Sequence, residues 1–445
     1  MKRTSGDRRP RVLVIAADPF GGTTGTGVTL SNLFHGWPKD RLAQVYATEM
    51  KPTTTTCDQY YRYAPSNAPV DYYVRRLLSK GNRRIFTEAS GIAGVPAVGS
   101  RGSWSAVAHR QMRAIADLSP ARLPQTLMTW VYEFDPDLVY SLLGSVRTMR
   151  MACKVARLCG KPLVPHFMDD WPTTLYASGE LAGYARRTVT SSLREVVRQS
   201  PQGICISGLM AEEYMLRYEM PFVDFANCVD KANFHDPAST QVEPSNSVDL
   251  VYVGGLHLGR WELLKDVAAA AQRASVGGLE ARLTVHAPDA HLRQYGHALS
   301  GLPFLRLGKS LAKNEVSSVL HGAAVLVHVE SYDEDIRQYT RLSLSTKIPQ
   351  YMAAGKPILG YGPAELASMR HIAAAGAGSI VGTQDSQLLT KHVTDLCRDT
   401  ELRRRLGANS YDYARRRHEK GEVATSFGSF LGDVALGSAS AVRDQ

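Results

Sequence analysis

Short apolar runs that alternate with longer helix-like stretches are the feature that most limits how this chain of 445 residues can fold. The runs expected to form strands before a polar interruption are 11–16, 45–48, 137–140, 162–165 and 203–207. Those expected after it are 248–255, 281–285, 304–307, 324–329, 357–360 and 379–381. Helices are expected at 28–37, 146–159, 180–199 and 209–218. This alternation is typical of βαβ units and predicts an α/β protein built on parallel sheets.

A polar, proline-containing segment at 236–247 interrupts this pattern. Prolines and small polar residues favour a linker there, and the length of the chain suggests about two or three domains. We therefore expect an N-terminal domain at 1–235, a linker at 236–247 and a second domain at 248–410. A C-terminal helix at 411–435 is expected to pack back on the N-terminal domain.

The positive charge of the chain is concentrated in its first half. The net charge is +10, but residues 1–235 hold 29 Lys and Arg against 20 Asp and Glu, whereas residues 236–445 hold 23 against 22. The segment 62–122 alone has ten basic and three acidic residues. Such a surface attracts anions, including acidic lipid headgroups, although it can also be a plain solvated face. We expect an anionic or lipid-linked molecule as a binding partner, peripheral membrane contact through 62–122, and no nucleic acid partner.

The six cysteines include no Cys-x-x-Cys pair, and none is grouped with histidines at the spacing of a metal-binding site. They are interpreted as reduced thiols. The apolar run behind the basic N-terminus is too short for a signal peptide, and no stretch approaches the length of a membrane span. These observations predict a cytoplasmic protein, with the inner face of the membrane as its site of peripheral contact.

Two glycine pairs follow strand-like runs. Gly21-Gly22 comes after the first run, where glycines let a ligand approach the backbone, although a tight turn explains them equally well. The second pair ends at Gly255 and is followed by Arg260 and Lys265, five positions apart. A guanidinium and an ammonium together suit a diphosphate, whereas two surface cations on a helix are the plainer interpretation.

A third motif, at 344–360, begins Leu-Ser-Thr-Lys and ends Ala-Gly-Lys-Pro-Ile-Leu-Gly. A Ser-Thr-Lys cluster at the start of a short apolar helix brings hydroxyls, backbone N–H groups and an ammonium together at the helix N-terminus. The helix dipole favours anions at that end. Ser345 or Thr346 acting as a simple N-cap is the alternative. Thr346 and Lys347 are therefore candidate anion-binding residues.

At this motif the chain resembles the retaining GT-B glycosyltransferases of the family-four type. Asn-Cys-Val-Asp-Lys-Ala-Asn-Phe at 227–234 is similar to a signature that precedes the linker of that family, and His166 with Asp169 and Asp170 is similar to its acceptor-side segment. The resemblance covers about 11–430. It implies two Rossmann-like, doubly wound domains with an interdomain cleft, the acceptor on the N-terminal domain and the nucleotide-sugar on the C-terminal domain.

The chain departs from this family at Ala226 and Cys228, in the signature that precedes the linker, and at two positions in and just before the third motif. Many relatives have glutamates where this sequence has Leu342 and Gln350. Gln350 can still bond the ribose through its amide. The helix instead resembles the Ser-Lys subgroup, with Glu330 as a candidate for the role of the first acid. The segment 331–341, acidic and then basic, is expected to be a loop without an assigned role.

The resemblance implies sugar transfer from a nucleotide-diphosphate sugar, with UDP as the expected nucleotide, to a hydroxyl acceptor with retention in glycan, polysaccharide or glycoconjugate synthesis. The expected catalytic residues are Arg260, Lys265 and His166. The expected donor-binding residues are Gly21, Gly22, Gly255, Thr346, Lys347, Gln350 and Glu330, and Asp169 and Asp170 are expected on the acceptor side. No metal or other cofactor is expected, because these cations can stabilise the leaving group. A GT-B sugar epimerase or phosphorylase, and a non-catalytic scaffold that binds a sugar nucleotide, are the alternatives.

Overall fold

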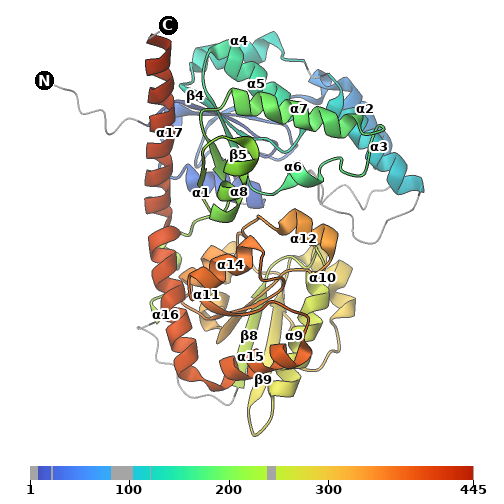
Figure 1. Cartoon of the computed structure of the whole chain (residues 1–445), viewed down its shortest axis with the longest axis vertical. Coiled ribbons are helices and arrows are strands. Elements are labelled where there is room, and N and C mark those ends of the chain that lie inside the picture. Colours follow the sequence, from blue (N-terminus) through green and yellow to red (C-terminus); the bar gives the residue numbers. More distant parts are fainter. Residues whose placement is uncertain (1–8, 22–23, 82–103, 121, 238–246, 444–445) are drawn as a thin grey trace, which may run out of the picture. The chain divides into compact units, whose positions relative to one another are not determined.

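The chain divides into two compact units. A computed structural model describes residues 9–21, 24–81, 104–120, 122–237 and 247–443 (Figure 1). Unit 1 comprises Met1–Ala226 with Val423–Gln445, and unit 2 comprises Asn227–Glu422. The first division follows Ala226, earlier than the linker expected at 236–247, most of which (238–246) lies outside the described residues. Unit 2 is therefore one continuous stretch of chain, whereas unit 1 is built from two.

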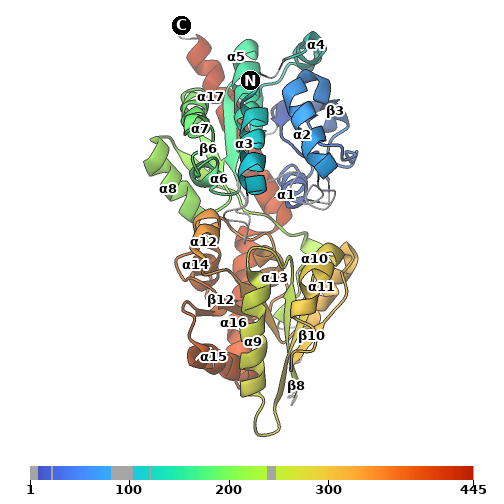
Figure 2. The same cartoon turned by 90° about the vertical axis from the view of Figure 1, so that its right-hand side faces the viewer.

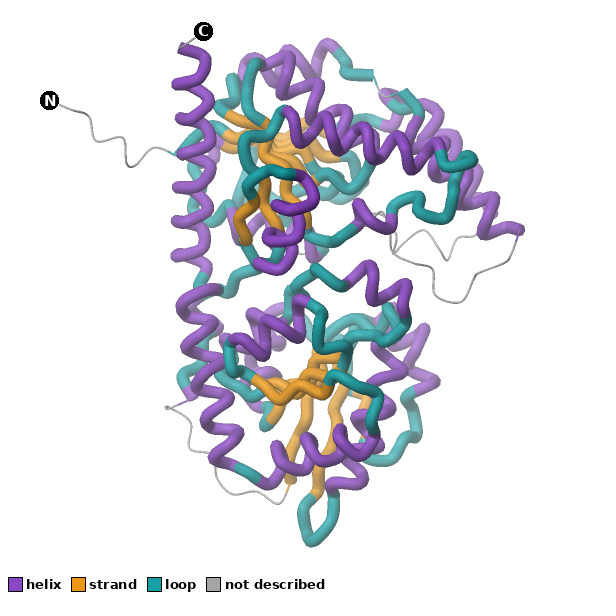
Figure 3. Tube along the Cα trace, in the orientation of Figure 1, coloured by secondary structure: helices purple, strands orange, loops and turns teal. Residues whose placement is uncertain are grey.

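The described residues of unit 1 form a seven-stranded parallel sheet in the order β3-β2-β1-β4-β5-β6-β7 (orange in Figure 3). Its strands are β1 (Val12–Ile15), β2 (Leu42–Tyr46), β3 (Gln59–Arg62), β4 (Leu138–Leu142), β5 (Leu163–Phe167), β6 (Gly203–Cys205) and β7 (Phe222–Asp224). Every residue of β1 is buried, as expected for a parallel strand covered on both faces. The edge strands β3 and β7 are only half-buried and were not among the expected strands.

Helices cover both faces of this sheet. They are α1 (Gly25–Leu33), α2 (Pro69–Gly81), α3 (Trp104–Leu118), α4 (Gln125–Phe134), α5 (Val146–Cys159), α6 (Trp171–Thr174), α7 (Tyr184–Arg198) and α8 (Gly208–Tyr218), with most of α17 (Lys420–Arg443). The Ser145 hydroxyl caps the start of α5, and Gly160 ends it in the left-handed conformation that glycine adopts without strain. On one face, Phe427 packs against Phe34 and Tyr140. Phe427 belongs to α17, which Figure 2 draws in red.

The described residues of unit 2 form a six-stranded parallel sheet in the order β10-β9-β8-β11-β12-β13. Its strands are β8 (Ser247–Val253), β9 (Glu280–His286), β10 (Leu305–Leu307), β11 (Val325–Val329), β12 (Ile358–Tyr361) and β13 (Gly378–Val381). Its helices are α9 (Arg260–Ala274), α10 (Asp289–Tyr295), α11 (Lys313–Gly322), α12 (Glu334–Thr340), α13 (Ile348–Ala353), α14 (Ala367–Ala374), α15 (Ser386–Arg398) and α16 (Thr400–Arg417).

Segment 331–341, expected to be a loop, contains helix α12. Asp333 caps it by accepting from the backbone N–H groups of Asp335 and Ile336. The expectation was wrong because the apolar signal was weak: only Ile336, Tyr339 and Thr340 of this helix are buried.

Both sheets have the strand order that gives Rossmann-like domains a topological switch point. In unit 1 the switch lies between β1 and β4, and in unit 2 between β8 and β11. Ligands of open α/β sheets bind beyond the carboxyl ends of the strands at this point. Across the described residues, no helix is both long and apolar enough to cross a membrane.

Candidate functional site

The carboxyl end of β8 carries the glycine pair that the sequence singled out. A Cβ atom at position 254 would lie 2.5 Å from Lys347 Nζ, and one at 255 would lie 2.7 Å from the ring of His257. No side chain fits at these distances, so the bare backbone at Gly254 and Gly255 makes room for a lysine and a histidine. Both lie at the switch point of unit 2.

Arg260 and Glu330 form a buried ion pair at this switch point. Arg260 opens α9 after Gly259, which has a φ of 70°, and Glu330 follows β11. Arg260 Nη2 donates to both carboxylate oxygens of Glu330, at 3.2 Å to Oε1 and 3.1 Å to Oε2. Arg260 Nε is also buried but has no hydrogen-bond partner among the described residues. The guanidinium therefore keeps a donor for a ligand.

The charge of Arg260 decides the protonation state of Glu330. Burial is the largest single influence and would raise the pKa of this carboxyl, but the guanidinium, together with smaller contributions from His328 and Lys347, outweighs it and holds the pKa below its ordinary value. His328 Nε2 lies 3.1 Å from Glu330 Oε1, without the alignment of a hydrogen bond. Burial lowers the pKa of His328 more than Glu330 raises it. Glu330 is thus the anion of this site and His328 a neutral neighbour.

Lys347 reaches the same site from the turn before α13. Its Nζ donates to Tyr252 Oη at 2.9 Å and lies 4.2 Å from the centre of that ring. Tyr252 in turn donates to the carbonyl of Gly255 at 2.5 Å. Burial and the charge of Arg260 lower the pKa of Lys347 well below its ordinary value. Tyr252 therefore connects the lysine to the glycine loop.

His257 is the neutral imidazole of this site. Burial, followed by the charge of Arg260, lowers its pKa to about 3. Its ring centre lies 5.1 Å from that of His291, whose Nδ1 accepts from the Leu256 N–H at 3.1 Å. His257 Nδ1 is buried and has no hydrogen-bond partner in the described parts of the chain. It can offer a hydrogen bond without adding charge.

The remaining expected donor-site residues of unit 2 lie around this cluster with weaker contacts. Lys265 lies on α9 with its Nζ 4.2 Å from the centre of the Trp261 ring. Thr346 is exposed, and its carbonyl accepts from Asn227 Nδ2 at 3.1 Å. Gln350 is half-buried on α13. The residue at the N-cap of α13 is Lys347, without a side-chain cap bond, so the N-cap alternative for Ser345 or Thr346 is wrong.

In unit 1, Gly21 lies beyond β1 and Gly22 lies outside the described residues. The Gly21 N–H donates to Ser31 Oγ at 3.0 Å, which ties the loop to α1. A Cβ at 21 would make only ordinary contact, whereas one at Gly27 would lie 3.1 Å from two carbonyl oxygens and from Thr24 Oγ1. The glycine with the tightest surroundings here is therefore Gly27, in the first turn of α1.

His166 lies within the sheet of unit 1 and is buried. Its Nδ1 lies 2.5 Å from Tyr140 Oη, and its Nε2 has no partner among the described residues. Burial lowers its pKa to about 3, so the imidazole is neutral near pH 7. A neutral imidazole with one free nitrogen can accept or donate one hydrogen bond, and its catalytic role stays a prediction.

Asp170 is occupied by structural contacts. Its carboxylate accepts from Tyr214 Oη at 2.7 Å, Arg217 Nη1 at 2.9 Å and Thr173 Oγ1 at 2.8 Å. These bonds tie α6 to α8. Asp169, which precedes it, is half-buried. The acceptor-side role of both residues stays a prediction.

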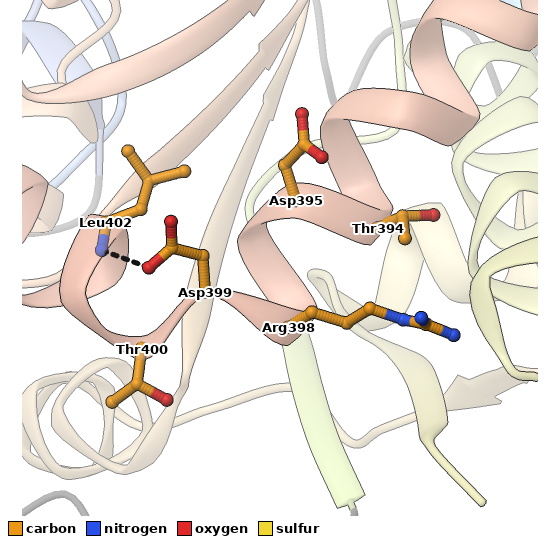
Figure 4. Close-up of a pocket in the computed structure, with 6 residues that line it drawn as sticks. All are labelled: Thr394, Asp395, Arg398, Asp399, Thr400 and Leu402. Carbon is orange, nitrogen blue, oxygen red and sulfur yellow. Dashed lines mark hydrogen bonds between the residues drawn. The ribbon is translucent and has the colours of Figure 1, made fainter. Parts of the chain in front are cut away.

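A surface pocket between α15 and α16 contains none of the expected site residues. Thr394, Asp395, Arg398, Asp399, Thr400 and Leu402 line it (Figure 4). Asp399 accepts from the Leu402 N–H at 2.8 Å and so caps α16, which gives these residues a structural role. No group of three or more metal-ligating side chains occurs among the described residues.

Tyr252 and His328 are the site residues that the sequence did not assign. Tyr252 lies two positions before Gly254, and His328 two positions before Glu330, so the period of a strand places each pair on the same side. This spacing of two residues was the sequence signal from which Tyr252 and His328 could have been placed in the site.

Comparison with known proteins gives no match to any family model and no match to any curated protein sequence. Solved structures do match. Anabaena HepE in complex with UDP is 12% identical over 95% of this chain and 100% of that chain, with a TM-score of 0.60. Sucrose-phosphate synthase from Thermosynechococcus elongatus is 11% identical over 97% and 100%, with a TM-score of 0.61. A UDP-forming α,α-trehalose-phosphate synthase from Burkholderia vietnamiensis is 10% identical over 95% and 99%, with a TM-score of 0.56.

The chain has the GT-B fold. The expected fold class, two doubly wound Rossmann-like domains, is thereby confirmed. At these identities the likeness shows the GT-B fold alone. The residues that do the chemistry have to be argued from the cluster in unit 2.

Proposed function

We propose that this chain is a glycosyltransferase that moves a sugar from a UDP-sugar to a hydroxyl acceptor. The GT-B fold supports this proposal, and HepE, with the same fold, has been solved with UDP and with UDP-glucose. The single observation that carries it is the cluster of the buried Arg260 and Glu330 with the half-buried Lys347 at the switch point of unit 2.

The chemistry of the cluster fits a leaving diphosphate. When the bond between sugar and diphosphate breaks, negative charge builds on the phosphate oxygens. Fixed cations that already face this position stabilise the charge without reorganising and so lower the barrier. Arg260 has a buried Nε donor free of described partners, and the ammonium of Lys347 donates only to a neutral hydroxyl. We propose that these cations replace a metal ion and that transfer proceeds with retention.

The acceptor side of the proposal concerns unit 1. Exposed apolar side chains on α2 and α3, namely Val70, Tyr72, Tyr73, Val107 and Ile115, accompany the exposed Arg76 and Arg113. Arginines near an anionic leaflet each contribute about 1 kcal/mol, and aromatic side chains suit the interface. We propose a cytoplasmic enzyme of glycan or polysaccharide synthesis that contacts an anionic membrane through 62–122, of which 82–103 lies outside the described residues.

The test of the activity measures release of UDP, and of the free or transferred sugar, from a panel of UDP-sugars by purified protein. Transfer should persist in EDTA, and NMR should show the anomeric configuration of the donor in the product. An altered sugar without a transferred product would instead indicate an epimerase, and dependence on inorganic phosphate a phosphorylase. Binding of UDP without turnover of any donor would indicate a scaffold, and absence of both would overturn the proposal.

The membrane contact has a separate test. The protein should sediment with vesicles that contain phosphatidylserine, but not with neutral vesicles, at low salt, and added salt should release it. Replacing Arg75, Arg76, Arg83 and Arg84 with Gln should abolish sedimentation and leave UDP binding unchanged. Wild-type protein that ignores anionic vesicles at low ionic strength would favour a soluble acceptor.

A further inference from the structure

Two basic groups and one acidic group meet at the switch point of unit 2, and the acidic group is already paired. Glu330 accepts from Arg260 through both oxygens. Lys347 forms no ion pair with any described residue, since its Nζ donates to the neutral hydroxyl of Tyr252. The site therefore has one basic group without a negative partner.

Lys347 is half-buried, and an ammonium taken partly out of water without an anion is costly, a cost that losing its proton removes. The groups that face Lys347 offer little compensation. Tyr252 on β8, Tyr351 on α13, His257 in the glycine loop and His328 on β11 are neutral, and Arg260 on α9 repels a second cation. Only Glu330 attracts the ammonium of Lys347. This attraction is weaker than the combined effect of burial and of Arg260, both of which disfavour the charged form.

We propose that Lys347 is neutral in the free protein and takes up one proton from solvent when a nucleoside diphosphate binds. This inference rests on the proposed function and adds to it a proton coupled to donor binding. The diphosphate brings the negative charge that the site lacks, and the proton from the buffer adds to Nζ. The bound state then pairs two cations with the phosphates, while Glu330 continues to hold Arg260.

The surroundings of Nζ suit both forms of Lys347. Tyr252 directs its hydroxyl proton to the Gly255 carbonyl, which leaves an oxygen lone pair for an N–H of the lysine. A neutral amine keeps that bond with one of its two N–H groups. The absent side chain of Gly254 leaves the space in which Nζ lies. Protonation therefore needs no rearrangement of the protein.

Proton uptake can be measured directly. UDP is titrated into the whole protein by calorimetry at pH 7.5, 8.5 and 9.5, each in buffers of different ionisation enthalpy. At these pH values the phosphates of UDP are fully ionised, since their second pKa is about 6. We expect uptake approaching one proton in at least part of this range, and there the Kd of UDP should rise by about tenfold per pH unit.

Two variants of Lys347 separate its titration from its charge. Lys347→Arg keeps a permanent cation and should bind UDP with no proton uptake. Lys347→Met is neutral, suits the half-buried position, and should bind weakly with no uptake. The control Lys391→Met alters an exposed lysine on α15, paired with Asp395, and should match the wild type.

Absence of UDP binding in the wild type would count against the proposed function. Binding with no uptake at any pH, or equal uptake in Lys347→Arg, would overturn this inference alone.

Discussion

The polar groups at the carboxyl edges of the two sheets differ in the charge that the protein leaves unmatched. In unit 1 the carboxylate of Asp170 accepts hydrogen bonds from three side chains, whereas His166 pairs with Tyr140 through Nδ1 and, as a neutral imidazole, keeps a buried Nε2 without a partner among the described residues. In unit 2 the guanidinium of Arg260 keeps a buried Nε without such a partner, and Lys347 forms no ion pair with a described residue. Buried groups are normally satisfied, so unmet cationic donors indicate an anionic ligand. The comparison therefore favours an anion site in unit 2 and does not favour one around Asp170 and His166.

Arg260→Ala should produce the largest effect, because it removes a phosphate donor and leaves Glu330 buried without its partner. We expect turnover to fall at least about tenfold. We also expect the free energy of unfolding to fall by about 3–5 kcal/mol. Urea unfolding and donor kinetics measure the two effects. The double variant Arg260→Met, Glu330→Gln should recover most of the stability and none of the turnover, and full activity in either variant would remove Arg260 from the site.

Asp170→Ala should affect stability and leave donor binding alone. It removes charge-assisted bonds to Arg217 and leaves the hydroxyl of Tyr214 buried without an acceptor, at a cost of about 3 kcal/mol. The Kd of UDP, measured by calorimetry, should stay within about twofold of the wild type. If the KM of the acceptor rises in a folded Asp170→Asn variant, the residue has the acceptor-side role that the sequence predicted.

Lys265→Ala tests whether unit 2 has a third phosphate cation. In the free protein Lys265 lies over Trp261, a contact that contributes about 0.5–1 kcal/mol, whereas a charge-assisted bond contributes about 1.5–3 kcal/mol. We therefore expect the ammonium to leave the ring for the diphosphate and the variant to lose at least about tenfold in turnover. Trp261→Leu, the matched control, should stay close to wild-type kinetics. Unchanged turnover in Lys265→Ala would leave Arg260 and Lys347 as the clamp.

His166 should make the stability of unit 1 depend on pH. Its pKa is about 3 in the folded protein and near 6.5 when unfolded, so the unfolded state binds more protons between these values. Stability is therefore fully present above pH 6.5 and is lost as the pH falls, by up to about 1.4 kcal/mol per unit. Urea unfolding between pH 7 and 5 should show a shallower dependence in His166→Asn, which can still pair with Tyr140. An equal dependence of stability on pH in the wild type and in His166→Asn would mean that the imidazole of His166 is protonated while the protein is still folded.

Gln350 should give the smallest effect. If it contacts the ribose, Gln350→Glu keeps or improves the affinity for UDP, because a carboxylate accepts from both hydroxyls. Gln350→Ala should weaken binding by about fivefold, the loss of one hydrogen bond. Identical Kd values for all three proteins would place this residue outside the site.

The sequence predicted the interior of each sheet better than the edges or the site. The runs at 11–16 and 324–329 contain β1 and β11, because strands buried on both faces are continuously apolar. β3, with the sequence Gln-Tyr-Tyr-Arg, was missed because an edge strand is half-exposed and can be polar. The spacing of Arg260 from Gly255 and Lys265 made it a candidate site residue, but its ion-pair partner Glu330 lies 70 residues away along the chain. Only the strand order brings such residues together.

The two-part construction of unit 1 has a consequence for synthesis. The ring centre of Phe427 lies 5.0 Å from that of Phe34 and 6.3 Å from that of Trp37, in a core that also includes Leu431 and Val434. A ribosome makes these side chains after the rest of unit 1 and after the whole of unit 2. Unit 2, whose residues are contiguous, can complete its core while the nascent unit 1 still exposes aromatic surface. Synthesis of unit 1 thus begins before that of unit 2, but unit 1 can complete its core only after it, and a chain released before Phe427 is made would present that surface to chaperones or to other nascent chains.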